Sequence, residues 1–143
     1  MDIKLLNEFA KVPTRGSEQA AGYDLYAATY KEIDIAPGGT VMVPTALAIC
    51  VPEGYFGGIY ARSGLATKRG LRPANCVGVI DSDYRGEVMV AVHNDSTEMQ
   101  TVFPQERIAQ LIIQPYQVVD MNVVEDLSKT NRGSKGFGST GTN

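Results

Sequence analysis

Short apolar segments separated by turn residues recur along this chain, and this punctuation is the feature that most constrains its fold. Ile33 and Ile35 precede an Ala-Pro-Gly-Gly turn at residues 36–39, and Val41 and Val43 follow it. Apolar residues that alternate with a period of two, bounded by Gly and Pro, are typical of β-strands. No segment keeps a helical period over several turns. The sequence therefore predicts an all-β protein.

Comparable segments are spread over the rest of the chain. Turn signals recur roughly every ten residues, which is typical of a β-sandwich, a jelly roll or a barrel. One short helix is expected at residues 65–69, ended by Gly70. We expect further strands at residues 47–51, 59–61, 102–103, 108–113 and 118–124.

Length and charge narrow the class of protein. The length of 143 residues fits a single domain. The net charge of the chain is −3. The net negative charge argues against nucleic acid as the main partner, because a phosphate backbone needs a basic surface. An anionic ligand must instead be bound by local Arg, Lys, backbone N–H groups or a metal ion. Neither a membrane span of ~20 apolar residues nor a signal peptide is present, so we expect a soluble cytoplasmic protein.

Two cysteines and one histidine restrict the possible chemistry. Cys50 and Cys76 lie in apolar, strand-like contexts, so we expect two buried free thiols in a reducing compartment. His93 lies in a turn-like His-Asn-Asp-Ser stretch and is expected to be an exposed loop residue. A His-ligated zinc site, a Ser-His-Asp triad or a Cys-His dyad would have to use this one histidine.

The most informative single stretch is Gly78–Glu87, which reads Gly-Val-Ile-Asp-Ser-Asp-Tyr-Arg-Gly-Glu. Two carboxylates, a tyrosine and an arginine lie between apolar runs at residues 77–80 and 88–92. This pattern predicts a hairpin-like turn. Taken alone, it is equally consistent with a solvated surface turn that has no chemical role.

The C-terminus differs in composition from the rest of the chain. From Ser128 onward it becomes rich in Gly, Ser and Thr. We therefore expect a β domain at residues 1–127 and a flexible arm at residues 128–143. Arg132, Lys135 and Phe137 on such an arm could close over a base and its phosphates.

Five stretches occur in an order and spacing that resemble the motifs of the trimeric dUTPase family, namely Ala21–Leu25, Arg62–Ala66, Gly78–Glu87, Arg107–Gln110 and the arm. The resemblance runs from residue 21 to residue 141. It implies a jelly-roll-like β-sandwich or distorted barrel that assembles as a homotrimer, with three active sites at subunit interfaces. In such a trimer one neighbour supplies Gly78–Glu87 and another supplies the arm.

The resemblance also implies a reaction: hydrolysis of dUTP to dUMP and pyrophosphate with Mg²⁺, which keeps uracil out of DNA and supplies dUMP for thymidylate synthesis. Asp81 matches the catalytic carboxylate that activates the water attacking the α-phosphorus. Asp83, the rival carboxylate, is expected to cap the turn. Arg62 and Gln110 match residues that hold phosphates and developing charge. Mg²⁺ is expected to be held by phosphates and water, with Asp24 either orienting a metal-bound water or serving as a structural aspartate.

Selectivity is assigned through the same resemblance. Asn75 matches a base-reading asparagine, and backbone groups of Gly78 and Val79 pair with uracil. The resemblance implies that Tyr84 packs on the deoxyribose and leaves no room for a 2′-hydroxyl, and that Phe137 stacks on the base. The other expected substrate contacts are Ser63, Gly64, Arg132, Lys135, Gly136, Gly138 and Ser139. Arg85 is expected to form an intersubunit ion pair instead.

Two other functions are compatible with an all-β protein of this size. A dCTP deaminase of the same architecture needs a glutamate in the strand after Gly78–Glu87, where this chain has Val90, Ala91 and Val92. Glu87 is too close to the turn to serve. A regulatory β-module that binds nucleotides or proteins without catalysis would be favoured by loss of Asp81, Tyr84 or the arm motif, and all are present.

Overall fold

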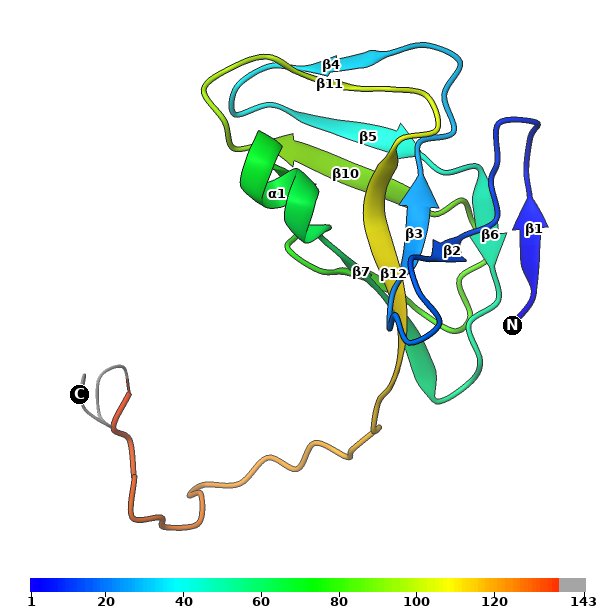
Figure 1. The fold of residues 1–143 in the computed structure, drawn as a ribbon. Coiled ribbons are helices and arrows are strands. Elements are labelled where there is room, and N and C mark those ends of the chain that lie inside the picture. The colour runs from blue at the N-terminus through cyan, green and yellow to red at the C-terminus, as the bar shows by residue number, and fades with distance from the viewer. Residues whose placement is uncertain (137–143) are drawn as a thin grey trace.

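The computed structural model of the chain describes residues 1–136 and contains short antiparallel strands with one helix in that range (Figure 1). Strands β1 to β6 are Ile3–Leu5, Thr14–Arg15, Tyr23–Tyr26, Ile33–Ile35, Thr40–Pro44 and Leu47–Ile49. Strands β7 to β12 are Tyr55–Tyr60, Leu71–Pro73, Gly78–Ile80, Met89–Asn94, Gln100–Val102 and Arg107–Pro115, and helix α1 is Ser63–Arg69. The predicted all-β class is confirmed.

Two larger sheets and two strand pairs make up the fold. The five-stranded sheet has the order β2-β3-β12-β7-β9, and the three-stranded sheet has the order β5-β10-β8. β1 pairs with β6, and β11 pairs with β4. In Figure 1, β5 and β10 run across β3 and β12. The described strands form a jelly-roll-like arrangement and do not close into a barrel.

The core lies between the two larger sheets, because buried apolar side chains of both belong to one contact cluster. β10 shows the alternation that builds it. Val90 and Val92 are buried, whereas Ala91 and His93 between and after them are half-buried. Leu25 of β3 and Leu111 of β12 fill the core from the opposite sheet. Burial of such side chains is the main stabilising term of the fold.

Helix α1 follows the sequence prediction closely. It ends at Gly70, whose φ of 66° is the left-handed conformation that glycine adopts readily. The Gly70 N–H donates to the carbonyl of Ala66 at 3.1 Å. Leu65 is buried and anchors the helix to the core. This helix is also the only one in the described range, and with seven residues it is too short to cross a membrane.

The predicted hairpin at Gly78–Glu87 is wrong in one respect. β9 pairs with β7, whereas β10 pairs with β5 and β8. β9 and β10 therefore belong to different sheets, and residues 81–88 connect them. An alternating pattern predicts strands but does not show which strands pair, since pairing depends on contacts remote in sequence.

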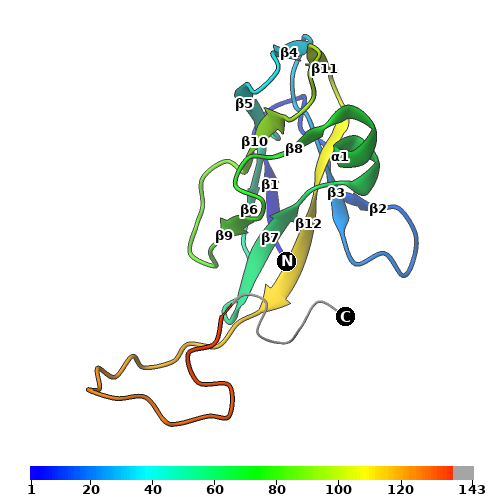
Figure 2. The same ribbon diagram turned by 90° about the vertical axis from the view of Figure 1, so that its left-hand side faces the viewer.

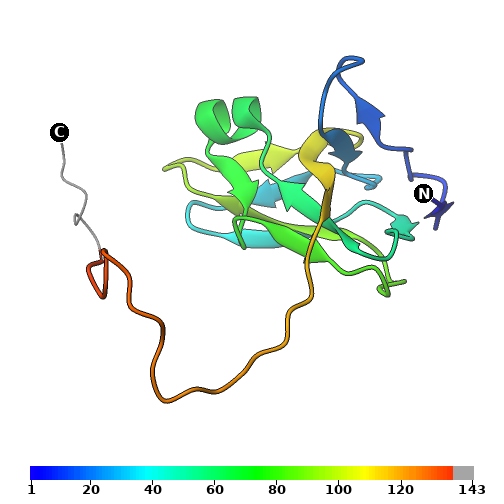
Figure 3. The same ribbon diagram turned by 90° about the horizontal axis from the view of Figure 1, so that it is seen from below.

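The expected strand at residues 118–124 is also wrong. β12 ends at Pro115, and residues 116–136 contain neither helix nor strand. The apolar side chains of this run are exposed, including Val118 at 84% and Val123 at 102%. In Figure 1, Figure 2 and Figure 3 the chain after β12 leads away from the sheets. The division into a domain at residues 1–127 and an arm at residues 128–143 stays a prediction.

The cysteines and the histidine differ from expectation. Both thiols are free, but Cys50 is half-buried and Cys76 is exposed. His93 lies on β10 rather than in a loop, and its side chain is only 23% exposed. Its Nδ1 bonds with the hydroxyl of Thr40 at 2.8 Å, and its Nε2 lies 3.3 Å from Oδ1 of Asp95.

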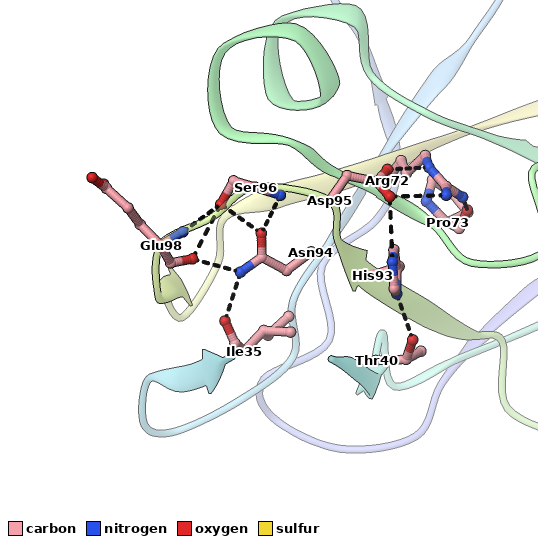
Figure 4. A network of polar contacts seen from close by, with 9 residues as sticks. All are labelled: Ile35, Thr40, Arg72, Pro73, His93, Asn94, Asp95, Ser96 and Glu98. Atoms are coloured by element: carbon pink, nitrogen blue, oxygen red, sulfur yellow. Dashed lines mark hydrogen bonds and ion pairs between the residues drawn. The ribbon is translucent and has the colours of Figure 1, made fainter. Parts of the chain in front are cut away.

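The turn after β10 is held by a polar network (Figure 4). The buried amide of Asn94 donates to the carbonyls of Ile35 and Glu98, each at 2.8 Å, and accepts from the hydroxyl of Ser96 at 2.7 Å. Asp95 accepts hydrogen bonds from Nε and Nη2 of Arg72. This bonding lowers the pKa of Asp95 below its ordinary value, mainly through the side-chain hydrogen bond.

Candidate active site

Three predicted site residues meet where β3, β12 and the start of α1 come together. Gln110 of β12 lies directly opposite Asp24 of β3 and, on its other side, opposite Tyr60 of β7. β7 ends at Tyr60, and Arg62 lies two residues further on, directly before α1 begins at Ser63. β12 is the central strand of its sheet, so it brings together motifs that are far apart in sequence.

A carboxylate between two arginines forms the charged centre of this region. Oδ1 of Asp24 accepts from Nε of Arg62 at 2.7 Å, and Oδ2 accepts from Nη1 of Arg107 at 3.1 Å. Nη1 of Arg62 also donates to the Arg107 carbonyl at 3.3 Å. The Asp24 side chain is 13% exposed, whereas those of Arg62 and Arg107 are 27% and 49% exposed. One negative and two positive charges leave a net positive site that suits phosphate oxygens.

A pocket of about 230 Å³ opens on this charged centre. Its lining includes Asp24, Arg62, Ser63, Gly64, Arg107 and Gln110. The Gln110 side chain is oriented by donating from Nε2 to the carbonyl of Ala61 at 2.9 Å. Gly22 leaves it room, since a Cβ there would overlap the Gln110 side-chain oxygen. We call this the cationic pocket.

Asp81 and Tyr84 lie in a different pocket of about 290 Å³. It is also lined by Val79, Glu87 and residues of β5, β9 and β10. Asp81 is exposed, and the Tyr84 side chain is 43% exposed. None of its lining residues lines the cationic pocket. We call this the carboxylate pocket.

The expected base-reading residues lie next to the carboxylate pocket. Gly78 is buried against Ile59, and a Cβ on it would lie 3.3 Å from Nδ2 of Asn75. β9 is an edge strand of its sheet, because β7 is its only partner among the strands of residues 1–136. The backbone groups on its other side can therefore pair with a ligand.

The arm residues lie apart from both pockets. Arg132, Lys135 and Gly136 are exposed, and Nε of Arg132 donates to the Lys135 carbonyl at 3.1 Å. Phe137, Gly138 and Ser139 lie outside the described residues. Arg85 bonds within its own loop, where Nη1 donates to the Ser82 carbonyl at 2.7 Å. Among residues 1–136, no three His, Cys, Asp or Glu side chains are placed to bind a metal ion together.

Sequence reasoning assigned no role to Arg107 or Glu87. Arg107 lies beside Asp24 because the register of β12 on β3 shifts between Arg107 and Ala109. No residue pattern in the sequence marks that shift. Glu87 has no part in the predicted dUTPase site, but its side chain accepts a hydrogen bond from the backbone N–H of Ala46, far away in sequence.

Comparison with known proteins identifies the family of the chain. A family model described as dUTPase matches residues 8–141. The deoxyuridine 5′-triphosphate nucleotidohydrolase of Bordetella pertussis is 46% identical over 99% of this chain and 97% of its own. The dUTPase of Staphylococcus bacteriophage 80alpha with dUPNHPP has a TM-score of 0.85 and 30% identity over 98% of this chain and 97% of its own.

A second solved structure is the D95N mutant dUTPase of S. aureus phage phi11. It has a TM-score of 0.77 and 25% identity over 87% of this chain and 96% of its own, and its description mentions a structural Mg(II) ion. The fold and the site thus define a jelly-roll-like nucleotide hydrolase. The chain belongs to the dUTPase family, and its enzymatic class is dUTP diphosphatase.

Proposed function

We propose that the chain hydrolyses dUTP as a homotrimer whose active sites are shared between subunits, with Asp81 as the base that activates water. The division of the site residues between two pockets of one chain is the observation that carries this proposal. The cationic pocket holds Arg62 and Gln110, and the carboxylate pocket holds Asp81 and Tyr84. A single chain therefore offers each half of the site on a separate surface, and a neighbouring copy can complete both.

The exposed apolar run at residues 118–124 supports assembly. Five of its side chains, Val118, Val119, Met121, Val123 and Val124, are at least 57% exposed. A cluster of exposed apolar residues of this kind usually marks an interaction surface. In the proposed trimer this run lies against a neighbouring subunit and leads the arm toward that subunit's site. Arg132, Lys135, Gly136, Phe137, Gly138 and Ser139 then close over the substrate.

The proposed chemistry is an in-line attack of water on the α-phosphorus. Asp81 accepts the proton of the water, and pyrophosphate leaves. The guanidinium of Arg62, oriented by Asp24, stabilises the charge on the phosphate oxygens together with Gln110, Ser63 and Gly64. Asn75 and the free edge of β9 at Gly78 and Val79 read uracil, and Tyr84 packs on the sugar.

The residues present fit a substrate-held Mg²⁺ better than a protein-held one. Both carboxylate oxygens of Asp24 accept hydrogen bonds from arginines, which supports an orienting role for Asp24 rather than a metal role. When bound, Mg²⁺ would neutralise phosphate charge, held by triphosphate oxygens and water. We also propose a cytoplasmic location, which the two free cysteines support.

Complementation between inactive variants tests the shared site. Asp81→Asn and Arg62→Ala each remove one half, so either protein alone should be nearly inactive. Refolded together in equal amounts, they should regain activity in about a quarter of the sites if chains mix at random. Each variant refolded alone is the control. If the mixture stays inactive, both halves come from one chain and the proposal of shared sites is wrong.

Solvent labelled with ¹⁸O tests the position of attack. The proposal expects the heavy atom in dUMP. Label found only in pyrophosphate would place the attack on the β-phosphorus and reject the proposed step.

A further inference from the structure

Residues 81–88 carry Asp81 and Tyr84 but have no strand pairing of their own. β9 ends at Ile80 in one sheet, and β10 begins at Met89 in the other. Within this connection the Tyr84 N–H donates to the Asp81 carbonyl at 3.2 Å, and Nη1 of Arg85 donates to the Ser82 carbonyl at 2.7 Å. These bonds are local to the connection, so the position of Asp81 and Tyr84 relative to the sheets depends on how the end of the connection is anchored.

The anchor is the buried segment between β5 and β6. Oε1 of Glu87 accepts from the backbone N–H of Ala46 at 2.7 Å. The Thr45 hydroxyl donates to the Val88 carbonyl at 2.5 Å, and the Val88 N–H donates to the Leu47 carbonyl at 2.8 Å. Thr45, Ala46 and Val88 are at most 1% exposed. Hydrogen bonds shielded from water in this way hold a fixed geometry.

The Ala46 N–H lies in the connection between β5 and β6 and is bonded by a side chain rather than by a neighbouring strand. The φ of Ala46, 52°, is in the left-handed region, which turns the chain between β5 and β6. Ala46 belongs to neither strand, and its N–H donates to the Glu87 carboxylate. A charged acceptor makes a stronger bond to an N–H than a neutral one.

Tyr84 folds back onto the same residue. Its hydroxyl donates to the Glu87 carbonyl at 3.0 Å. Gly86 leaves room for this contact, since a Cβ there would overlap the Tyr84 hydroxyl. Glu87 is thus bonded to the segment 45–47 through its side chain and to Tyr84 through its backbone.

We propose that Glu87 is a positioning residue that holds Tyr84, and with it the Asp81 turn, in the geometry that discriminates deoxyribose from ribose. This inference rests on the proposed function, because it assumes that Tyr84 contacts the sugar. Glu87 acts through the Ala46 N–H and through Tyr84, and it does not take part in the reaction. Without the Glu87 carboxylate, residues 81–88 should become more mobile, and Tyr84 should leave more space beside the sugar.

Glu87→Ala and Glu87→Gln in the full chain test this role, with Glu53→Ala as the control for loss of an exposed carboxylate. Glu87→Ala should lower the ratio of kcat/KM for dUTP to that for UTP by about tenfold. Glu87→Gln should restore most of the ratio, since its side-chain oxygen can accept from the Ala46 N–H. Glu53→Ala should leave the ratio unchanged. A Glu87→Ala enzyme that melts earlier but keeps the wild-type ratio would show that Glu87 only stabilises the fold and would overturn the proposal.

Tyr84→Phe provides a second variant that keeps the ring and removes only the hydroxyl bond to Glu87. It should lower the same ratio, and its effect should not add to that of Glu87→Ala. Additive effects of the two substitutions would overturn the proposal. An unchanged ratio in Tyr84→Phe would overturn it even if Glu87→Ala failed to fold.

Hydrogen exchange separates this inference from the proposed function. Glu87→Ala should speed exchange of the Ala46 amide and of residues 81–88, and Glu87→Gln should not. A wild-type chain that did not hydrolyse dUTP would overturn the proposed function. Unchanged amide hydrogen exchange in Glu87→Ala would overturn the positioning role of Glu87, whether or not the chain hydrolyses dUTP.

Discussion

Nε of Arg62 donates to Oδ1 of Asp24 at 2.7 Å, so the arginine that opens helix α1 is held by a nearly buried carboxylate of strand β3. Arg107 bonds the other oxygen of the same carboxylate at 3.1 Å. The two guanidinium groups are thereby oriented while keeping part of their surface exposed to the pocket. A preorganised cation of this kind needs no rearrangement when a phosphate binds.

Asp24→Asn should weaken both activity and stability. The neutral amide cannot balance two guanidinium groups, so we expect about a tenfold loss of kcat/KM and about 1–3 kcal/mol lower free energy of unfolding. Kinetics and urea denaturation measure the two effects. Asp126→Asn, an exposed carboxylate of the segment after β12, should change neither. A wild-type kcat/KM in Asp24→Asn would show that Arg62 needs no orienting partner.

Asp81→Asn should abolish turnover and leave nucleotide binding largely intact. A positioned base contributes a factor of about 10²–10⁴ to the rate, and asparagine cannot accept the proton. Asp83→Asn, in the same turn, should keep activity within a few-fold of the wild type. Reversed results for the two variants would assign the base to Asp83.

Gly22→Ala should disturb Gln110. The added Cβ would overlap the Gln110 side-chain oxygen, and the side chain would have to leave the Ala61 carbonyl. We expect kcat/KM to fall by about tenfold, together with a lower melting temperature. Gly16→Ala is a matched control for stability, since a Cβ at Gly16 meets nothing within 4 Å. Equal melting temperatures for both variants would contradict the expected clash.

Asp95→Asn should make stability less dependent on pH in the acid range. The pKa of Asp95 is lowered by its bond to Arg72, so the folded state binds the proton less well than the unfolded chain does. The contribution of Asp95 is therefore complete above the ordinary pKa of 3.8 and is lost as pH falls through the lowered value. Melting temperatures of wild type and variant should differ near neutrality and converge in strong acid. A difference that persists in acid would mean that Asp95 acts through something other than its charge.

Truncation before Thr130 should leave a folded, assembled protein with severely reduced catalysis. The removed segment contains Arg132 and Lys135 but no part of a sheet within the described residues. Sedimentation measures assembly, and steady-state kinetics measure turnover. Normal turnover in the truncated protein would show that the arm does not close the site.

The sequence by itself determined the β class, the helix ended by Gly70, and the residue types of each functional stretch. These properties are local, because strand alternation and a glycine cap depend only on near neighbours in the chain. Only the tertiary structure decided that β9 and β10 lie in different sheets, that Arg107 shares Asp24 with Arg62, and that Glu87 bonds to Ala46. It also decided that the apolar run at residues 118–124 is exposed rather than a paired strand. These outcomes depend on strand register and on contacts between residues remote in sequence, which no local pattern encodes.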